Sequence, residues 1–382
     1  MVKQSDVAFR LMARKWGAHC CYTPMLKSLK FLQGIEEEMA EFVTVAGSAD
    51  RPLIVQVCGR CPKQLADMAL LVHSLAPGGF DAFDLNLGCP MENAEAEGYG
   101  SFLIEDAEGI QTACNCVQEL AAAQALPVCC KIRILASVQE TVRLARLLEA
   151  AGCSLLTVHG RRRAAKGRGP VDWGAISAVR AAVGIPVVAN GGIRTREEAD
   201  LMMQETGCAG VMVATALLIN PRLFAEPCEK HTVGKAISVA LEYLQFAEQH
   251  LPRPIVLRKH FWYFFRNVLL KDADDDGGLA SVRGERMPPS LLGTEGHKFY
   301  TFMNQPFLCS VLQFRAILRL MAHKLNVEPW VKLMVESLAG EVPVLSMAEI
   351  RRLSGTSVVN FTNSTSCEEG DDWEPDCSLL WE

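Results

Sequence analysis

One cysteine of this chain lies in a context that is unusual for an inert thiol. The run Asp84-Leu85-Asn86-Leu87-Gly88-Cys89-Pro90 is typical of a buried strand that ends in a turn, because Gly88 and Pro90 interrupt regular structure on either side of Cys89. The C-terminal ends of barrel strands are where such barrels carry their catalytic groups. A thiol at this position is therefore a candidate for chemistry. A buried, unreactive cysteine is the alternative interpretation.

Further polar side chains lie near the ends of other apolar runs. They are Gln56, Lys131, His159 and Asn190. Each alone has a structural explanation, since a lone histidine is more often a satisfied core residue and a lysine can extend its stem along an apolar surface. Together with Cys89 they predict one shared site, because barrel strands all end on the same face. The glycines Gly191 and Gly192, and the turn at Ala214-Thr215, would bring backbone N–H groups to a phosphate.

These residues belong to a regular alternation of apolar and amphipathic segments over residues 19–216. Seven strand-like runs are expected at His19–Met25, Pro52–Gly59, Ala82–Cys89, Pro127–Ile134, Leu155–Arg161, Pro186–Gly192 and Gly210–Ala216. Amphipathic helices, such as Val138–Ala151, lie between them. The pattern predicts an α/β fold, a TIM-type barrel covered by helices, with right-handed crossovers. A full barrel has eight strands, so one is missing.

The C-terminal part of the chain has a different pattern. Strand signals stop after residue 226, and amphipathic helices are expected at Ile237–His250, Ile255–Leu270 and Ser310–Leu325. We therefore predict a barrel over residues 1–226, a helical domain over 227–340 and a disordered acidic tail over 341–382.

Composition narrows the class of protein. The chain has 382 residues, 49% of them hydrophobic, and we expect no membrane-spanning segment because no apolar run is long enough. Its 15 cysteines are odd in number and lie mostly in apolar runs, which predicts reduced thiols in the cytoplasm or the nucleus. Cys58 and Cys61 form a Cys-x-x-Cys pair without a second pair nearby, so no metal site is predicted. The net charge is −6, and removing the seven acids of residues 366–382 leaves +1.

Seven motifs in order along the chain resemble the tRNA-dihydrouridine synthases. They are Tyr22-Thr23-Pro24-Met25, Pro52-Leu53-Ile54-Val55-Gln56, Asn86-Leu87-Gly88-Cys89-Pro90 with Gly98-Tyr99-Gly100, Lys131-Ile132-Arg133, Thr157-Val158-His159-Gly160-Arg161, Ala189-Asn190-Gly191-Gly192-Ile193-Arg194, and Gly210-Val211-Met212-Val213 leading to Asn220-Pro221. The family's first strand ends in an Ala-Pro-Met motif, and we expect this chain to begin just after it. An incomplete gene model or a downstream start codon is one explanation, and a seven-stranded variant is the other.

The resemblance implies an enzyme that reduces the 5,6 double bond of uridine in the D-loop of tRNA with FMN and NAD(P)H. It implies that Cys89 is the general acid, and that Gln56, Lys131, His159 and Asn190 surround the flavin. The phosphate of FMN is expected at the turns of Gly191-Gly192 and Ala214-Thr215. Many family members carry Gly-Arg where this chain has Ala214-Thr215. Asn86 would contact the base or the flavin. A stacked uridine must be turned out of the helix to reach such a site.

A basic cluster follows the predicted strand at Leu155–Arg161. Its cations are Arg161, Arg162, Arg163, Lys166 and Arg168, and a second cluster comprises Arg258, Lys259, His260 and Arg266. Such charge runs are often merely solvated. Five cations near the predicted site nevertheless favour contact with the phosphates of tRNA. The resemblance also implies that the helical domain at 227–340 binds tRNA.

Two alternative functions stay open at this point. One is an FMN barrel reductase of a free small molecule, and the other is a non-catalytic RNA-binding relative. Within the preferred function, Tyr22-Thr23-Pro24-Met25-Leu26 favours a uridine early in the D-loop, whereas Ala96-Glu97-Gly98-Tyr99-Gly100 favours a late one. We expect a monomer.

Overall fold

The computed structural model describes residues 3–43, 49–123, 126–165, 167–225, 232–269 and 311–324. The chain divides into two compact units, and the division falls near Leu217–Glu229. The predicted boundary at 226/227 lies outside the described residues, as does the whole of the predicted tail at 341–382, so both stay predictions.

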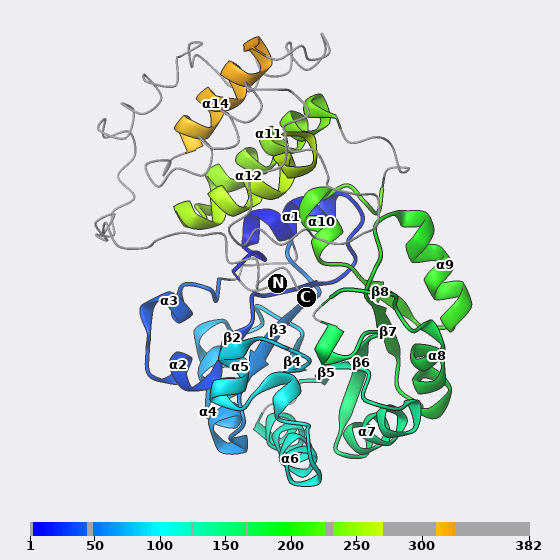
Figure 1. Ribbon diagram of the computed structural model, residues 1–382. Coiled ribbons are helices and arrows are strands. Elements are labelled where there is room, and N and C mark those ends of the chain that lie inside the picture. Colours follow the sequence, from blue (N-terminus) through cyan, green and yellow to red (C-terminus); the bar gives the residue numbers. More distant parts are fainter. Residues whose placement is uncertain are drawn as a thin grey trace. The chain divides into compact units, whose positions relative to one another are not determined.

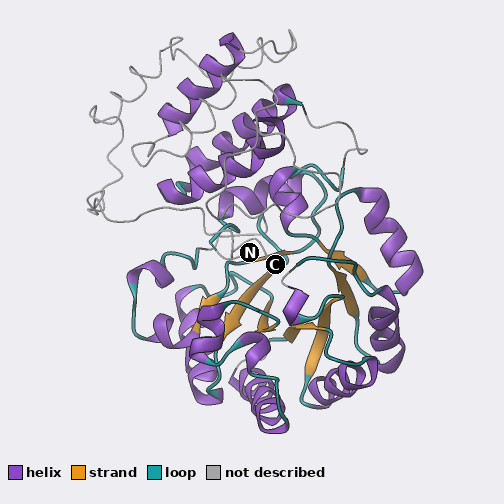
Figure 2. Cartoon of the chain, in the orientation of Figure 1, coloured by secondary structure: helices purple, strands orange, loops and turns teal. Residues whose placement is uncertain are grey.

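The first unit is built on a parallel sheet that curls as part of a barrel, with helices against its outer face (Figure 1 and Figure 2). Its strands are β1 (Cys21–Tyr22), β2 (Leu26–Lys27), β3 (Leu53–Cys58), β4 (Ala82–Leu87), β5 (Val128–Arg133), β6 (Cys153–His159), β7 (Val187–Asn190) and β8 (Gly210–Met212). The strand order is β1-β3-β4-β5-β6-β7-β8, and β2 also pairs with β3. The predicted TIM-type α/β fold is confirmed.

The first expected strand, His19–Met25, is shortened to β1, and β2 follows directly after its predicted end. Residues 23–25 separate β1 from β2, because Pro24 has no N–H to donate to a ladder. Both pair with β3, at Cys21↔Leu53 and at Leu26↔Val57, so they share one strand position. The sheet therefore has seven positions, as predicted, and no ladder between described residues joins β8 to β1.

Helices precede, connect and follow the strands of the sheet. They are α1 (Val7–Lys15), α2 (Ser28–Leu32), α3 (Glu36–Met39), α4 (Pro62–Leu75), α5 (Glu92–Glu97), α6 (Ala107–Ala123), α7 (Val138–Ala150), α8 (Trp173–Ala182), α9 (Arg196–Thr206) and α10 (Thr215–Ile219), with 3₁₀ turns η1 (Gly100–Phe102) and η2 (Arg163–Ala165). Local sequence sets their starts: Ser137 and Glu140 form a capping box for α7, and Thr195 caps α9.

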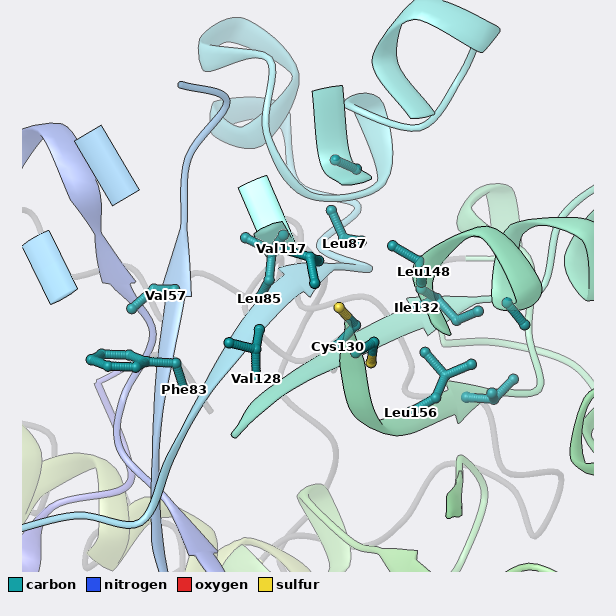
Figure 3. Packing of buried hydrophobic residues seen from close by; sticks show 14 of the residues in the cluster. Val57, Phe83, Leu85, Leu87, Val117, Val128, Cys130, Ile132, Leu148 and Leu156 are labelled. Carbon is teal, nitrogen blue, oxygen red and sulfur yellow. The ribbon is translucent and has the colours of Figure 1, made fainter. Parts of the chain in front are cut away.

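Strand side chains alternate between the helix-covered face and the inner face of the sheet. Leu85 and Leu87 of β4, with Ile132 of β5, belong to the large apolar core under the helices (Figure 3). Because side chains point to opposite faces with a period of two, Asp84 and Asn86 lie on the inner face. The polar residues that the sequence analysis singled out are those of the inner face.

A buried ion-pair network attaches α1 to the sheet. The guanidinium of Arg10 donates to Asp50 at 2.8 Å and to the carbonyl oxygen of Val43, and Arg14 donates to the other oxygen of Asp50 at 3.0 Å. Arg10 and Asp50 are each only 1% exposed. Removing one partner of such a buried pair leaves the other charge uncompensated, which is costly.

The second unit consists, where it is described, of α11 (Val233–His250), α12 (Pro254–Leu269) and α14 (Val311–Lys324). α11 packs against both other helices. An aromatic cluster fills their interface: the rings of Tyr243 and His260 are 4.6 Å apart, and those of Phe261 and Phe314 are 4.3 Å apart. His260 is fully buried in this cluster, so it is not part of a basic surface.

Candidate active site

The strand register brings the predicted inner-face residues together. Asn86 of β4 lies beside Lys131 of β5, and on the next strand pair Arg133 lies beside His159 of β6. His159 is in turn the register partner of Asn190, the last residue of β7. Adjacent residues of a parallel sheet share a face, so these side chains converge at the carboxyl ends of the strands.

Hydrogen bonds join three inner-face residues, Gln56 of β3 with Asp84 and Asn86 of β4. The side-chain amide of Gln56 donates to Asp84 Oδ2 at 2.9 Å, and Asn86 Nδ2 donates to Gln56 Oε1 at 3.3 Å. All three side chains are buried. The amides are thereby held in fixed orientations.

The turn that carries Cys89 is fastened from two sides. Asn86 Oδ1 accepts hydrogen bonds from the backbone N–H groups of Gly88 and Cys89, both at 3.0 Å. Arg133 Nε donates to the carbonyl oxygen of Gly88 at 2.7 Å. Asn86 therefore supports the thiol's turn directly, and whether it also contacts a ligand stays a prediction.

Cys89 itself lies in a small apolar cluster and is 3% exposed. The cluster comprises Met25, Cys58, Cys89, Ala94 and Tyr99. Burial raises the pKa of the Cys58 thiol well above its usual value, and a negative charge on Cys89 would raise it further. Burial likewise raises the pKa of the Tyr99 hydroxyl. These surroundings favour uncharged groups.

His159 and Asn190 present buried polar atoms to the same end of the sheet. His159 Nδ1 and Asn190 Oδ1 have no hydrogen-bond partner among the described residues. Asn190 Nδ2 donates to the carbonyl oxygen of Met212 at 2.9 Å, which fixes the side chain between β7 and β8. Because a buried polar atom without a partner is costly, these two atoms indicate a place for a ligand.

Glycine is required directly after Asn190. Gly191 and Gly192 have φ angles of +114° and +75°, where other residues are strained. A Cβ on Gly191 would lie 2.5 Å from Cδ2 of His159, and a Cβ on Gly192 would lie 3.5 Å from Nη2 of Arg161. The turn thus brings backbone close to the imidazole and to one guanidinium.

The electrostatics at this end of the sheet are positive. Burial lowers the pKa of His159 well below its usual value, and the charges of Arg133 and Lys131 lower it further. Burial also lowers the pKa of Arg161, with the charge of Arg194 as a second cause. Burial and the neighbouring cations thus both disfavour protonation of His159, and these cations suit an anionic ligand.

The cations of the predicted basic cluster have different partners and different exposure. Arg161 is half-buried and donates to the carbonyl oxygen of Gly169 at 2.8 Å, whereas Arg162 is exposed and donates to the carbonyl oxygen of Ala136. Arg163 forms an ion pair with Glu105. Arg168 is exposed, and Lys166 lies outside the described residues. Only part of the cluster therefore faces solvent.

The remaining sequence predictions are placed as follows. Ala214 follows β8, and Thr215 begins the five-residue α10. Within the described ranges, no group of three or more His, Cys, Asp or Glu side chains is arranged to hold a metal ion, every cysteine is free, and none of the helices has the length and apolar character needed to cross a bilayer.

Three residues that support the site escaped sequence reasoning: Asp84, Arg133 and Ser101. Asp84 and Arg133 are charged residues in otherwise apolar strands, two positions from Asn86 and Lys131 respectively. That period of two was a usable signal, because it places each on the inner face. The hydroxyl of Ser101 donates to the carbonyl oxygen of Cys89 at 2.7 Å. Ser101 gave no such signal in the sequence, since this contact depends on how a loop folds back.

The sheet carries a cysteine, a lysine, a histidine and an asparagine at the carboxyl ends of its strands. This is the arrangement of a TIM-barrel enzyme. The family model "Dihydrouridine synthase (Dus)" matches residues 1–262, and the chain belongs to this family.

Two relatives show the same sequence identity to this chain. A rat (Rattus norvegicus) protein named as tRNA-dihydrouridine(16/17) synthase-like is 41% identical over 275 residues, which are 70% of this chain and 59% of the relative. A mouse (Mus musculus) protein named as tRNA-dihydrouridine(20a/20b) synthase-like is 41% identical over 225 residues, which are 59% of this chain and 67% of the relative. The match therefore spans only about three fifths of the rat protein.

Proposed function

We propose that this protein is a flavin-dependent tRNA-dihydrouridine synthase, which reduces the 5,6 double bond of uridine in tRNA with NAD(P)H. The family membership and the names of the relatives support the reaction class. The observation that carries the proposal is the Cys89 turn, which Asn86 and Arg133 hold at the strand ends beside the buried His159–Asn190 pair. A protein that only binds RNA has no need of this arrangement.

The residues present fit an FMN group. His159 Nδ1 and Asn190 Oδ1 are buried and lack partners in the described chain, and the Gly191-Gly192 turn leaves no room for a Cβ. Gln56 and Lys131 would line the isoalloxazine, and the phosphate would lie near Gly191-Gly192 and Ala214-Thr215. Arg161 would add charge there, since Thr215 stands where many relatives carry arginine. FMN, when bound, would supply the hydride.

The chain's own residues account for the proton and the orientation of the base. Cys89 would donate the thiol proton to the uracil carbon beside the one that receives hydride, which is general acid catalysis. Its apolar surroundings keep nearby thiol and hydroxyl groups protonated. The charge of Lys131 would favour the anionic form of the reduced flavin ring, because opposite charges attract strongly in a dry site.

Exposed cations of the first unit support the proposal that the substrate is tRNA. Arg162 and Arg168 are exposed and would contact tRNA phosphates. A uridine early in the D-loop, at 16/17 in the rat relative's name, stays the preferred target over 20a/20b. The free cysteines suit a reducing compartment, the cytoplasm or the nucleus. We expect a monomer.

The test is dihydrouridine formation on tRNA that lacks the modification, measured by mass spectrometry of nucleosides with NADH or NADPH. We expect product with the natural chain, none with Cys89→Ala, and unchanged product with the control Cys208→Ala. The Cys89→Ala variant should keep its flavin absorption and its tRNA affinity, whereas Lys131→Met should lose flavin. Activity on free uridine without activity on tRNA would support the small-molecule reductase instead. Absence of flavin binding would support the non-catalytic relative.

A further inference from the structure

Arg163 of the basic cluster contacts a distant segment of the first unit in three ways. Its guanidinium forms an ion pair with Glu105, 58 residues earlier in the chain. The guanidinium carbon lies 4.4 Å from the ring centroid of Phe102, and Nη1 is 3.4 Å from the carbonyl oxygen of Ser101. Three contacts of different kinds thus join the loop after β6 to the segment Gly100–Glu105.

That same segment is packed directly onto Cys89. The backbone N–H and the hydroxyl of Ser101 both donate to the carbonyl oxygen of Cys89, at 3.1 Å and 2.7 Å. Gly100 approaches so closely that a Cβ there would lie 2.9 Å from Cβ and from the carbonyl oxygen of Cys89. The segment therefore helps to fix the position of the thiol, and its Phe102 packs against the buried cluster that contains Cys89.

The contacts of Arg163 differ from those of its neighbour. Arg162 donates to the carbonyl oxygen of Ala136, on the loop after β5, and among the described residues it forms no hydrogen bond or ion pair with the Gly100–Glu105 segment. The charge of Arg163 is already balanced by Glu105, and its planar guanidinium already lies over an aromatic ring. These contacts are more typical of an arginine that holds a loop in place than of one that binds a phosphate.

We propose that Arg163 is a positioning residue for Cys89, because it fastens the Gly100–Glu105 segment against the turn that carries the thiol. The proposal rests on the proposed function only in treating Cys89 as the acid of that reaction. Arg163 acts through Ser101 and Gly100 and does not contact the reacting atoms.

The first test measures how well the thiol is covered, without any need for activity. Natural protein and variants are treated with N-ethylmaleimide, and labelling of each cysteine is followed by peptide mass spectrometry. Exposed Cys20 serves as the internal reference. Loss of one exposed ion pair and one cation–π contact in Arg163→Gln should speed labelling of Cys89 about three- to tenfold. Glu105→Gln should give a smaller increase, and Arg163→Lys should restore most of the protection.

Arg162→Gln is the matched control, since it removes a cation one residue away that contacts a different loop. We expect its Cys89 labelling rate to equal that of the natural chain. Glu105→Gln also guards against misfolding of the arginine variant, because it changes only an exposed carboxylate.

The second test separates positioning from RNA binding through steady-state kinetics on tRNA. Arg163→Gln should lower kcat by about the factor seen in labelling and leave the KM for tRNA nearly unchanged, and Arg163→Lys should recover kcat. An increased KM with unchanged Cys89 labelling would overturn the proposal and make Arg163 an RNA contact. If the natural chain forms no dihydrouridine, the proposed function fails, while the labelling result still decides the role of Arg163.

Discussion

The close approach of Gly100 to Cys89 makes a quantitative prediction for Gly100→Ala. Gly100 has a φ of +67°, and a Cβ there would lie 2.9 Å from two backbone-fixed atoms of Cys89 and 3.2 Å from its nitrogen. Carbon atoms prefer a separation of about 3.5–4.0 Å, so Cys89 must shift by about half an ångström or more. No flexible side chain is available to relieve the contact.

The free-energy cost has two parts. A left-handed conformation costs an alanine about 1–2 kcal/mol, and forcing an extra methyl group into packed structure costs a further ~1–3 kcal/mol. Gly34→Ala isolates the first part, because Gly34 has the same φ of +67° and nothing within 4 Å of a Cβ. We therefore expect Gly100→Ala to lose about 1–3 kcal/mol more stability than Gly34→Ala.

Urea unfolding of the two variants measures this difference. The same proteins are then assayed for dihydrouridine formation, where a shifted thiol should lower kcat on the order of tenfold in Gly100→Ala. Gly34→Ala should keep natural turnover. Equal stability losses in the two variants, or full turnover in Gly100→Ala, would refute the reasoning that this segment determines where the thiol lies.

Three further predictions concern other parts of the first unit. Asp50→Asn leaves Arg10 and Arg14 without their carboxylate and should cost about 3–5 kcal/mol in urea unfolding, whereas Asp67→Asn in the exposed pair with Lys63 should cost under about 0.5 kcal/mol; equal losses would contradict the role of burial. The pKa of His159 is lowered in the folded state. As pH falls below about 6.5, His159 therefore gains a proton in the unfolded chain but not in the folded one. The free energy of unfolding should then fall by up to about 1.4 kcal/mol per pH unit. His159→Gln should remove that slope, and an unchanged slope would show that another group causes it. Gly191→Ala places a Cβ 2.5 Å from the imidazole and should weaken FMN binding in a fluorescence titration, whereas Gly207→Ala, with open space around it, should not.

Much of the fold followed from local sequence pattern. The seven apolar runs predicted the strands, because strands of a parallel sheet that is covered by helices are mostly apolar. Helix bounds were within a few residues, for example α7 at Val138–Ala150 against the predicted Val138–Ala151, since Ser137 and Glu140 mark its start. The end of β1 before Pro24 and the separate strand β2 were missed, although Pro24 was visible in the sequence.

The candidate site was predictable for strand residues and not for loop residues. Lys131, His159 and Asn190 could be assigned to one site because parallel strands end together, and the register placed them there. The cations of residues 161–168 could not be sorted in the same way, since nothing local distinguishes Arg162 from Arg163. Their environments depend on which distant loop each one meets.

The sequence by itself determined the strands, the helix starts and the set of groups at the strand ends, because hydrophobic period, capping and proline act over a few residues. Only the tertiary structure decided that Ser101 and Gly100 pack on Cys89 and that Arg163 pairs with Glu105. Those contacts join loops that follow different strands, and the curvature of the sheet, which no short segment encodes, brings them together. The same curvature gives Asn86 and Arg133 a common role at one turn.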